Sequence, residues 1–96
     1  MAAGYVIAQI NVTDPEAYKA YVAAVSPIVE KYGGEYLVRG GPAQHFEGES
    51  IGERTVVIRF PTLQAATEWY HSEEYAPVRA MRQAASNSLQ TIVEGA

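Results

Sequence analysis

The sequence predicts a small α+β domain whose elements follow the order strand, helix, strand, strand, helix, strand. Two segments, 5–12 and 54–60, show the period-two alternation of side chains that is typical of half-buried strands. A long stretch between them carries apolar residues at helical spacing. The chain has 96 residues, of which 48% are hydrophobic and 19% charged, so it can bury one core and is not disordered.

The first helix is expected to begin after Asp14, which can accept hydrogen bonds from free backbone N–H groups, while Pro15 fits the first helical position. Its apolar stripe contains Tyr18, Tyr21, Val22, Val25, Ile28, Val29 and Tyr32. Pro27 lies opposite this stripe, so we expect a kinked but continuous helix that bends around the core. Gly33 is the expected left-handed residue that ends the helix.

The second half of the chain repeats the pattern with a broken helix. Pro61 ends the strand 54–60, Thr62 can cap a helix, and Ser72 marks a fresh helix start. The remaining elements are expected as strand 35–39 with a possible continuation at 43–47, loop 48–53, helix segments 63–71 and 72–85, and strand 89–94. This order is that of a ferredoxin-like fold, a four-stranded antiparallel sheet with its helices on one face.

The alternation along the four strands assigns each side chain to one of the two sheet faces. The face expected to lie under the helices carries Val6, Ala8, Ile10, Val12, Tyr36, Val38, Val56, Ile58, Phe60, Leu89 and Val93. The opposite face carries Tyr5, Ile7, Gln9, Asn11, Leu37, Arg39, Thr55, Val57, Arg59, Gln90, Ile92 and Glu94. The apolar members of this second set would form an exposed patch on a monomer. We therefore expect a homodimer that buries this face, against the alternative of a monomer with a partly wet sheet.

The composition excludes several classes of function. A net charge of −4 and a pI near 5.0 argue against a general nucleic-acid binder, and no apolar run is long enough for a membrane span. The first residues lack the basic region of a secretory signal. The absence of cysteine excludes disulfides, thiolate metal sites and a cysteine nucleophile. We expect one cytoplasmic domain, residues 1–96, with no cofactor, no metal, and no nucleic-acid or membrane partner.

A series of short segments spread over the whole chain resembles one protein family. The segments are Gly4 to Ala8, Asp14 to Tyr18 with Tyr21, Tyr32 to Gly34, Arg39 to Gly41, Phe46 to Gly48, Val56 to Pro61, Ala66 with Trp69 and Tyr70, Ser72 with Glu74 and Tyr75, Arg79 with Arg82, and Val93 to Gly95. In this order they resemble the DUF1330 family, a family of unknown function in the dimeric α/β-barrel superfamily. The resemblance implies a ferredoxin-like subunit and a dimer whose two sheets form a barrel. It implies no activity, because neighbouring families on this fold range from cofactor-independent oxygenases to stress-response proteins, and a shared fold does not transfer chemistry.

Two arginines of the last helix are candidates for binding an anionic group. Arg79 and Arg82 lie four and seven residues after Tyr75, and Arg82 borders the apolar stripe, where it should reach the rim between helix and sheet. An arginine there can clamp a carboxylate or a phosphate in a bidentate fork. The alternatives are an ion pair with Glu73 or Glu94, or simple coverage of the core by the side-chain stem.

Arg39 and the aromatic residues complete the candidate ligand site. Arg39 precedes two glycines and is expected to point into a ligand site or the dimer interface, or to pair with a glutamate. Tyr18 lies on the inward stripe of the first helix, and Trp69 and Tyr75 flank the helix break. Aromatic walls with arginine suit a flat, anionic small molecule, whereas the alternative is core packing with satisfied hydroxyls. The predicted ligand-binding set is Tyr18, Arg39, Trp69, Tyr75, Arg79 and Arg82.

The remaining titratable residues give weaker signals. His45 and His71 could each act as a general base or a haem ligand, but His45 lies in a glycine-bounded stretch and His71 suits a helix C-terminus. Glu47, Glu49 and Glu53 form an acidic loop that could do acid–base work or be merely solvated. The sequence has no phosphate-binding loop, no dinucleotide fingerprint and no nucleophile elbow.

The sequence is compatible with three functions. The first is a dimeric domain that binds a small aromatic or carboxylate-bearing metabolite. The second is a cofactor-independent oxygenase, isomerase or lyase that uses His45, Tyr18 or Tyr75 as acid or base. The third is a structural protein in which dimerisation is the only function.

Overall fold

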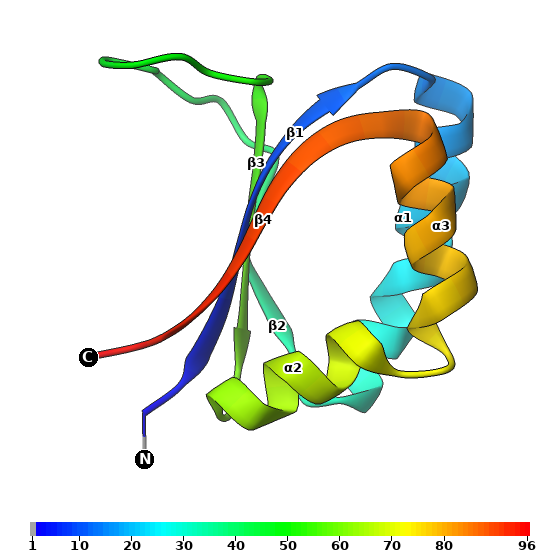
Figure 1. The fold of residues 1–96 in the computed structure, drawn as a ribbon, viewed down its shortest axis with the longest axis vertical. Coiled ribbons are helices and arrows are strands. Elements are labelled where there is room, and N and C mark those ends of the chain that lie inside the picture. The colour runs from blue at the N-terminus through cyan, green and yellow to red at the C-terminus, as the bar shows by residue number, and fades with distance from the viewer. Residues whose placement is uncertain (1) are drawn as a thin grey trace.

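A computed structural model describes residues 2–96 and places the helices of this part of the chain on one face of a twisted antiparallel sheet (Figure 1). The elements are β1 (Gly4–Val12), α1 (Pro15–Lys31), β2 (Glu35–Arg39), β3 (Arg54–Phe60), α2 (Leu63–His71), α3 (Tyr75–Ala85) and β4 (Ser86–Glu94). The strand order is β2-β3-β1-β4, and each neighbouring pair is antiparallel. The predicted ferredoxin-like fold is therefore confirmed. We call the helix-covered side of the sheet the inner face and the other side the outer face.

Helix α1 begins and ends where the sequence predicts. The Asp14 carboxylate accepts from the backbone N–H of Ala17 at 3.2 Å, and Pro15 occupies the first turn. The helix continues through the exposed Pro27, which lies away from the core. Gly33 takes a φ of 83° just after the helix, a left-handed conformation that a side chain disfavours. The chain can therefore turn sharply into β2.

The break between α2 and α3 is also confirmed, and one hydroxyl organises it. The Ser72 Oγ donates to the carbonyl of Trp69 at 2.9 Å and accepts from the backbone N–H of Tyr75 at 3.1 Å. It thus helps to end α2 and to begin α3, which starts at Tyr75 rather than at Ser72. The corner brings Trp69 and Tyr75 into a stacked contact with ring centroids 4.3 Å apart.

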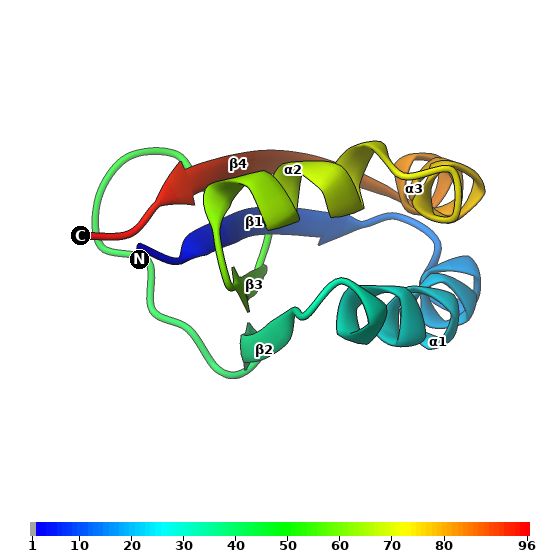
Figure 2. The same ribbon diagram turned by 90° about the horizontal axis from the view of Figure 1, so that it is seen from below.

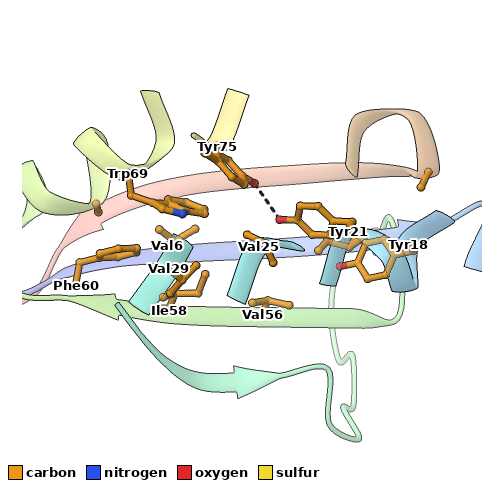
Figure 3. Packing of buried hydrophobic residues seen from close by; sticks show 14 residues of the cluster. Val6, Tyr18, Tyr21, Val25, Val29, Val56, Ile58, Phe60, Trp69 and Tyr75 are labelled. Atoms are coloured by element: carbon orange, nitrogen blue, oxygen red, sulfur yellow. Dashed lines mark hydrogen bonds between the residues drawn. The ribbon is translucent and has the colours of Figure 1, made fainter. Parts of the chain in front are cut away.

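The three helices make different packing contacts. Helix α2 packs against β1, β3 and β4, whereas α1 and α3 pack mainly against each other (Figures 1 and 2). Large side chains fill the space between these layers, as Figure 3 shows for Trp69, Tyr75 and Tyr21. The fully buried side chains include Trp69, Tyr75, Phe60, Val6 and Val29. Each such side chain stabilises the fold by roughly 1.5–3 kcal/mol relative to exposure.

Strand β4 corrects the sequence-based face assignment. Its register pairs Ala8 with Gln90 and Val6 with Ile92, and directly opposite residues share a sheet face. Gln90 and Ile92 therefore lie on the inner face, and Leu89 and Val93 lie on the outer face, the reverse of the prediction. Apolar and polar residues alternate along β4 with the same period on both faces, so periodicity alone could not say which set points inward.

Strand β2 contains a second correction. The pairing with β3 shifts between Tyr36 and Val38, which marks a bulge. After the bulge, Val38 lies opposite Val57 on the outer face and Arg39 lies opposite Val56 on the inner face. The prediction had these two side chains the other way round, because one extra residue reverses the alternation.

The chain between β2 and β3 forms a long loop rather than more strand. The continuation of β2 that was predicted for 43–47 is wrong, and residues 41–50 are all exposed. Gly40, with a φ of 75°, turns the chain away from the sheet, and the loop projects on the side opposite the helices (Figure 1). The Gln9 side chain holds its returning end through Ser50 Oγ at 3.0 Å and the N–H of Ile51 at 3.2 Å. Strand β4 also begins three residues earlier than predicted, at Ser86.

Candidate functional site

A cavity of about 30 Å³ lies between α1 and the inner face of the sheet. We call it the inner cavity. Its wall is formed by one face of α1, the inner residues of β1, β2 and β3, Trp69 of α2 and Gln90 of β4. The wall contains four aromatic side chains and two arginines, Arg39 and Arg54, but no aspartate or glutamate. A volume of this size holds one or two ordered water molecules, so a larger ligand must displace water and move side chains at the rim.

Arg54 is the first residue of β3 and lies against the cavity wall beside Tyr18. The guanidinium carbon is 5.3 Å from the centroid of the Tyr18 ring. Burial raises the pKa of the Tyr18 hydroxyl, although the Arg54 guanidinium opposes this change. A Cβ on Gly40 would lie 2.5 Å from Arg54 Nη1, so the glycine leaves room for this arginine.

Arg39 lies at the open edge of the inner cavity. Its guanidinium carbon lies 4.3 Å from the centroid of the Tyr36 ring, and Nη2 donates to Ser26 Oγ at 2.5 Å. The Arg39 side chain is exposed. Burial raises the pKa of Tyr36, so this phenol is neutral at pH 7. The edge therefore combines an exposed cation with an aromatic ring, which suits the approach of a flat anion.

Two buried N–H donors on the cavity wall lack a partner among residues 2–96. They are Arg54 Nε and Trp69 Nε1. Trp69 is 2% exposed and lies between the rings of Phe60 and Tyr75 (Figure 3). Buried polar groups usually have a hydrogen-bond partner, and an unpaired one costs about 1–3 kcal/mol. The cavity thus has two places where a bound acceptor would lower the free energy.

Arg82 lies behind the cavity wall and is 3% exposed. It donates from Nη1 to Ser88 Oγ at 2.6 Å. The Gln90 amide, with its oxygen turned toward the guanidinium, accepts from Nε at 3.2 Å and from Nη1 at 3.0 Å. Burial works against the charge, but the nearby hydroxyls of Tyr75 and Tyr21 outweigh it and raise the Arg82 pKa. Within residues 2–96 no carboxylate forms an ion pair with Arg82, so neither Glu73 nor Glu94 is its partner.

The structure separates the predicted ligand-binding residues into two groups. Tyr18, Arg39 and Trp69 line the inner cavity. Tyr75 and Arg82 lie behind its wall, where the Tyr75 hydroxyl shares a buried hydrogen bond of 2.9 Å with the Tyr21 hydroxyl (Figure 3).

Arg79 lies farther out, at the corner between α2 and α3. Its Nη1 donates to the carbonyl of Tyr70 at 2.5 Å, and its guanidinium carbon is 5.0 Å from the centroid of the Tyr70 ring. Arg79 therefore braces this corner and does not reach the cavity.

Sequence reasoning missed Arg54, Tyr36 and Gln90 as cavity residues. A signal for Arg54 was present, because it precedes the inward Val56 by two residues and must share its face. Gln90 was assigned to the wrong face together with the rest of β4. Tyr36 was correctly placed on the inner face, but no pattern in the sequence tied it to a cavity.

The histidines lie outside the inner cavity. His45 Nε2 is 2.9 Å from the carbonyl oxygen of Gly48 in the exposed loop, and His71 is exposed at the end of α2. His45 lines a wide groove between the loop and the ends of β1 and β3, together with Glu53. In residues 2–96 no group of three or more histidine, cysteine, aspartate or glutamate side chains is arranged to hold a metal ion. None of the helices in this range has the length and apolarity that crossing a bilayer requires.

The outer face carries the exposed apolar residues of the sheet. Leu89 is 59% exposed and Val93 is 43% exposed, and Ile7 lies between them on the neighbouring strand. Leu37 and Val38 extend this surface along β2. The β4 correction thus makes the outer face more apolar than the sequence suggested. We call this set the outer patch.

The fold and the cavity together define a ferredoxin-like α+β protein with a small cavity between its helices and its sheet. Residues 3–96 match the model of the family described as a domain of unknown function, DUF1330, and the chain belongs to this family. No curated protein matches the chain.

Solved structures resemble the whole chain at low sequence identity. RPA0582 of Rhodopseudomonas palustris, a protein of unknown function, is 18% identical with a TM-score of 0.81, over 99% of this chain and 83% of its own. SnoaB of Streptomyces nogalater, a cofactor-independent oxygenase, is 12% identical with a TM-score of 0.63, over 97% and 92%. Rv0793 of Mycobacterium tuberculosis is 20% identical with a TM-score of 0.52, over 95% and 92%. At these identities the likeness establishes the fold and not the activity.

Proposed function

We propose that this protein is a homodimer in which each subunit binds a small aromatic or carboxylate-bearing metabolite in the inner cavity. The dimer forms through the outer patch, and the ligand lies between α1 and the sheet. One observation carries the ligand half of the proposal: the cavity wall combines aromatic rings and arginines with no acidic side chain. Such a wall favours planar molecules with negative charge.

The outer patch supports the dimer. Five large aliphatic side chains are exposed on it, and no helix of residues 2–96 covers this face (Figure 1). A second copy of the same surface is the simplest cover, since two-fold association is the commonest oligomer. Light scattering at micromolar concentration should give about twice the subunit mass of 10.4 kDa. A single species at the subunit mass would contradict the dimer.

Trp69 offers a direct test of ligand binding, because it is the only tryptophan and lines the cavity. Saturable quenching of its fluorescence by aryl carboxylates such as benzoate is the expected result. Arg39→Ala should weaken the binding about tenfold, since the exposed Arg39 guanidinium at the edge of the cavity can donate to a carboxylate. Lys19→Ala, which removes an equal charge from an exposed site on α1, should leave it unchanged. Quenching that is absent, or equal in both variants, would contradict the proposed site.

A second candidate is a cofactor-independent oxygenase on the same cavity. The similarity to SnoaB and the presence of Tyr18 in the wall favour it over an isomerase or a lyase. In this case the protein, in metal-free buffer, should consume dioxygen with an electron-rich phenol, and Tyr18→Phe should slow the reaction. If dioxygen is not consumed and no ligand binds, dimerisation is the remaining function.

A further inference from the structure

We infer that the inner cavity selects an elongated planar ligand that carries hydrogen-bond acceptors, and not donors, at both ends. The inference rests on the proposed binding function and adds the ligand class. It starts from the two unpaired donors in the cavity wall, Arg54 Nε and Trp69 Nε1. Both groups can only donate, because neither a guanidinium nor an indole N–H accepts a hydrogen bond.

The other polar groups of the wall strengthen this bias. The Gln90 amide turns its oxygen to Arg82, which leaves its NH₂ group as the part that can face a ligand. Arg39 at the edge also only donates. The tyrosine hydroxyls can donate as well as accept, and that of Tyr21 is already bonded to Tyr75. An acceptor therefore finds more partners in the cavity wall than a donor does, and a ligand cation meets two arginines.

The two unpaired donors belong to opposite ends of the cavity. Arg54 pairs with Ile10 across the sheet, whereas Trp69 packs on Phe60, beyond the pairing of Ile58 with Val6. The two contacts therefore lie at backbone levels at least four residues apart along β1, which is about 13 Å or more at the usual rise of a strand. Figure 3 places Trp69 above Val6 and Phe60, and places Tyr18, the ring that Arg54 contacts, at the far end. A single carboxylate is too short to bridge two such levels, so the ligand needs acceptors at both ends of an elongated planar body.

The small volume of the cavity sets the mode of entry. About 30 Å³ is room for one or two water molecules and not for a ring, so wall side chains must move when a ring enters. The ligand therefore displaces this water, and Arg39 leaves the face of Tyr36 to admit it. Its acceptors pair with the two donors, while its ring packs against aliphatic side chains such as Val56 and Val25.

The single indole N–H gives one resonance in a nitrogen–proton NMR spectrum of the labelled protein, and it reports directly on Trp69. The probes are benzene-1,4-dicarboxylate, benzoate and benzamidinium at pH 7. We expect the dicarboxylate to bind at least tenfold more tightly than benzoate and to move the indole proton downfield. Benzamidinium, which has a similar shape but carries donors, should produce no saturable shift.

Two variants test whether the preference for the dicarboxylate depends on the donors at the two ends of the cavity. Calorimetry measures the affinities for the dicarboxylate and for benzoate. Trp69→Phe keeps an aromatic ring and removes the donor, and Arg54→Met keeps the chain length and removes the guanidinium. Each should reduce the tenfold preference for the dicarboxylate to threefold or less. Lys19→Met is the charge-matched control and should retain the preference. Circular dichroism checks that each variant is folded, and Trp69→Tyr replaces Trp69→Phe if that variant is not.

Two results would overturn the inference while the proposed function stands. One is binding of benzamidinium as tight as that of benzoate, and the other is a dicarboxylate preference that survives in both variants. Failure of the proposed function itself has a different signature. In that case none of the three probes, nor uncharged phenol or indole, would bind, and the indole proton would show contact only with a long-lived water molecule.

Discussion

Strands β1 and β4 are neighbours along their whole length, but they distribute polarity in opposite ways. On β1 the inner residues Val6, Ala8 and Ile10 are apolar and buried. On β4 the inner residues Ser88 and Gln90 are polar and Ile92 is apolar, whereas Leu89 and Val93 face outward. The two strands share one sheet and one register. The difference therefore comes from what each strand must contact on either side.

The comparison shows that one sheet serves three purposes. Strand β1 anchors the core under α2. The inner residues of β4 hold the buried Arg82 without a carboxylate, and its outer residues supply the most exposed part of the outer patch. Polar side chains on the inner side of a strand therefore indicate a polar partner inside the protein, because a polar group removed from water needs a hydrogen bond there.

Truncation of the inner side of β1 should give the largest effect. Ile10→Ala removes a buried side chain and should lower the free energy of unfolding by about 2–5 kcal/mol. Ile7→Ala, on the outer side of the same strand, should cost less than about 1 kcal/mol in the separated subunit. Urea denaturation at low protein concentration measures both. Equal losses would mean that the two faces are equally packed and would break the comparison.

A charge on the outer side of β4 should act on association rather than on folding. Leu89→Lys places a cation in the outer patch and should weaken the dimer at least about a hundredfold, which is about 2.7 kcal/mol. The subunit should stay folded by circular dichroism. Gln83→Lys adds the same charge on the exposed side of α3 and should leave the dimer intact, as sedimentation will show. A Leu89→Lys protein that remains dimeric would move the interface elsewhere.

Tyr21→Phe tests the hydrogen bond that joins α1 to α3. It should cost about 1–2 kcal/mol at pH 7, because the Tyr75 hydroxyl loses its phenol partner.

The same variant has a predictable pH dependence. Burial first, and then the neighbouring Tyr75, raise the Tyr21 pKa above 10, so its contribution to stability is complete below pH 10 and is lost as the pH rises further. The wild-type protein should therefore lose stability more steeply than the variant between pH 10 and 11, by up to about 1.4 kcal/mol per pH unit. Parallel slopes in denaturation series would contradict the raised pKa.

The smallest effect is expected at the exposed ion pair between α1 and the start of α3. Lys31 Nζ lies 2.6 Å from Glu74, and the hydrogen bonds from Lys31 and Tyr32 lower the Glu74 pKa. At a pH above its ordinary pKa, the ionised Glu74 carboxylate stabilises the fold. This stabilisation is lost as the pH falls through the lowered pKa of the folded state. Glu74→Gln should lower Tm slightly at pH 7 and match the wild type near pH 3. A constant difference in Tm across this range would exclude the ionised pair as its cause.

The sequence was sufficient to predict the helices and strands, because the residues that begin and end them act locally. The bounds of β2, β3 and α2 agree with the prediction. Gly33 precedes β2, Pro61 follows β3 and Thr62 precedes α2, and each of these residues has a definite conformational preference. The family resemblance and the ferredoxin-like fold were also confirmed.

The site was harder to predict, because it depends on register and not on local preference. A bulge at Leu37 reversed Arg39, and the inward polar residues of β4 were assigned outward on the assumption that apolar side chains face the core. The two unpaired donors depend on three-dimensional packing, which no spacing in the sequence reports. Ligand binding by the predicted set stays a prediction, with Tyr18, Arg39 and Trp69 now placed in one cavity.

The loop between β2 and β3 makes this protein convenient for spectroscopic labelling. The loop is tied down at its end by Gln9, while its tip is open to solvent, and the chain contains no cysteine. A thiol introduced by Glu47→Cys would therefore be the sole attachment point for a spin label. In a two-fold assembly the labels form one symmetric pair, whose separation pulsed electron resonance can measure directly.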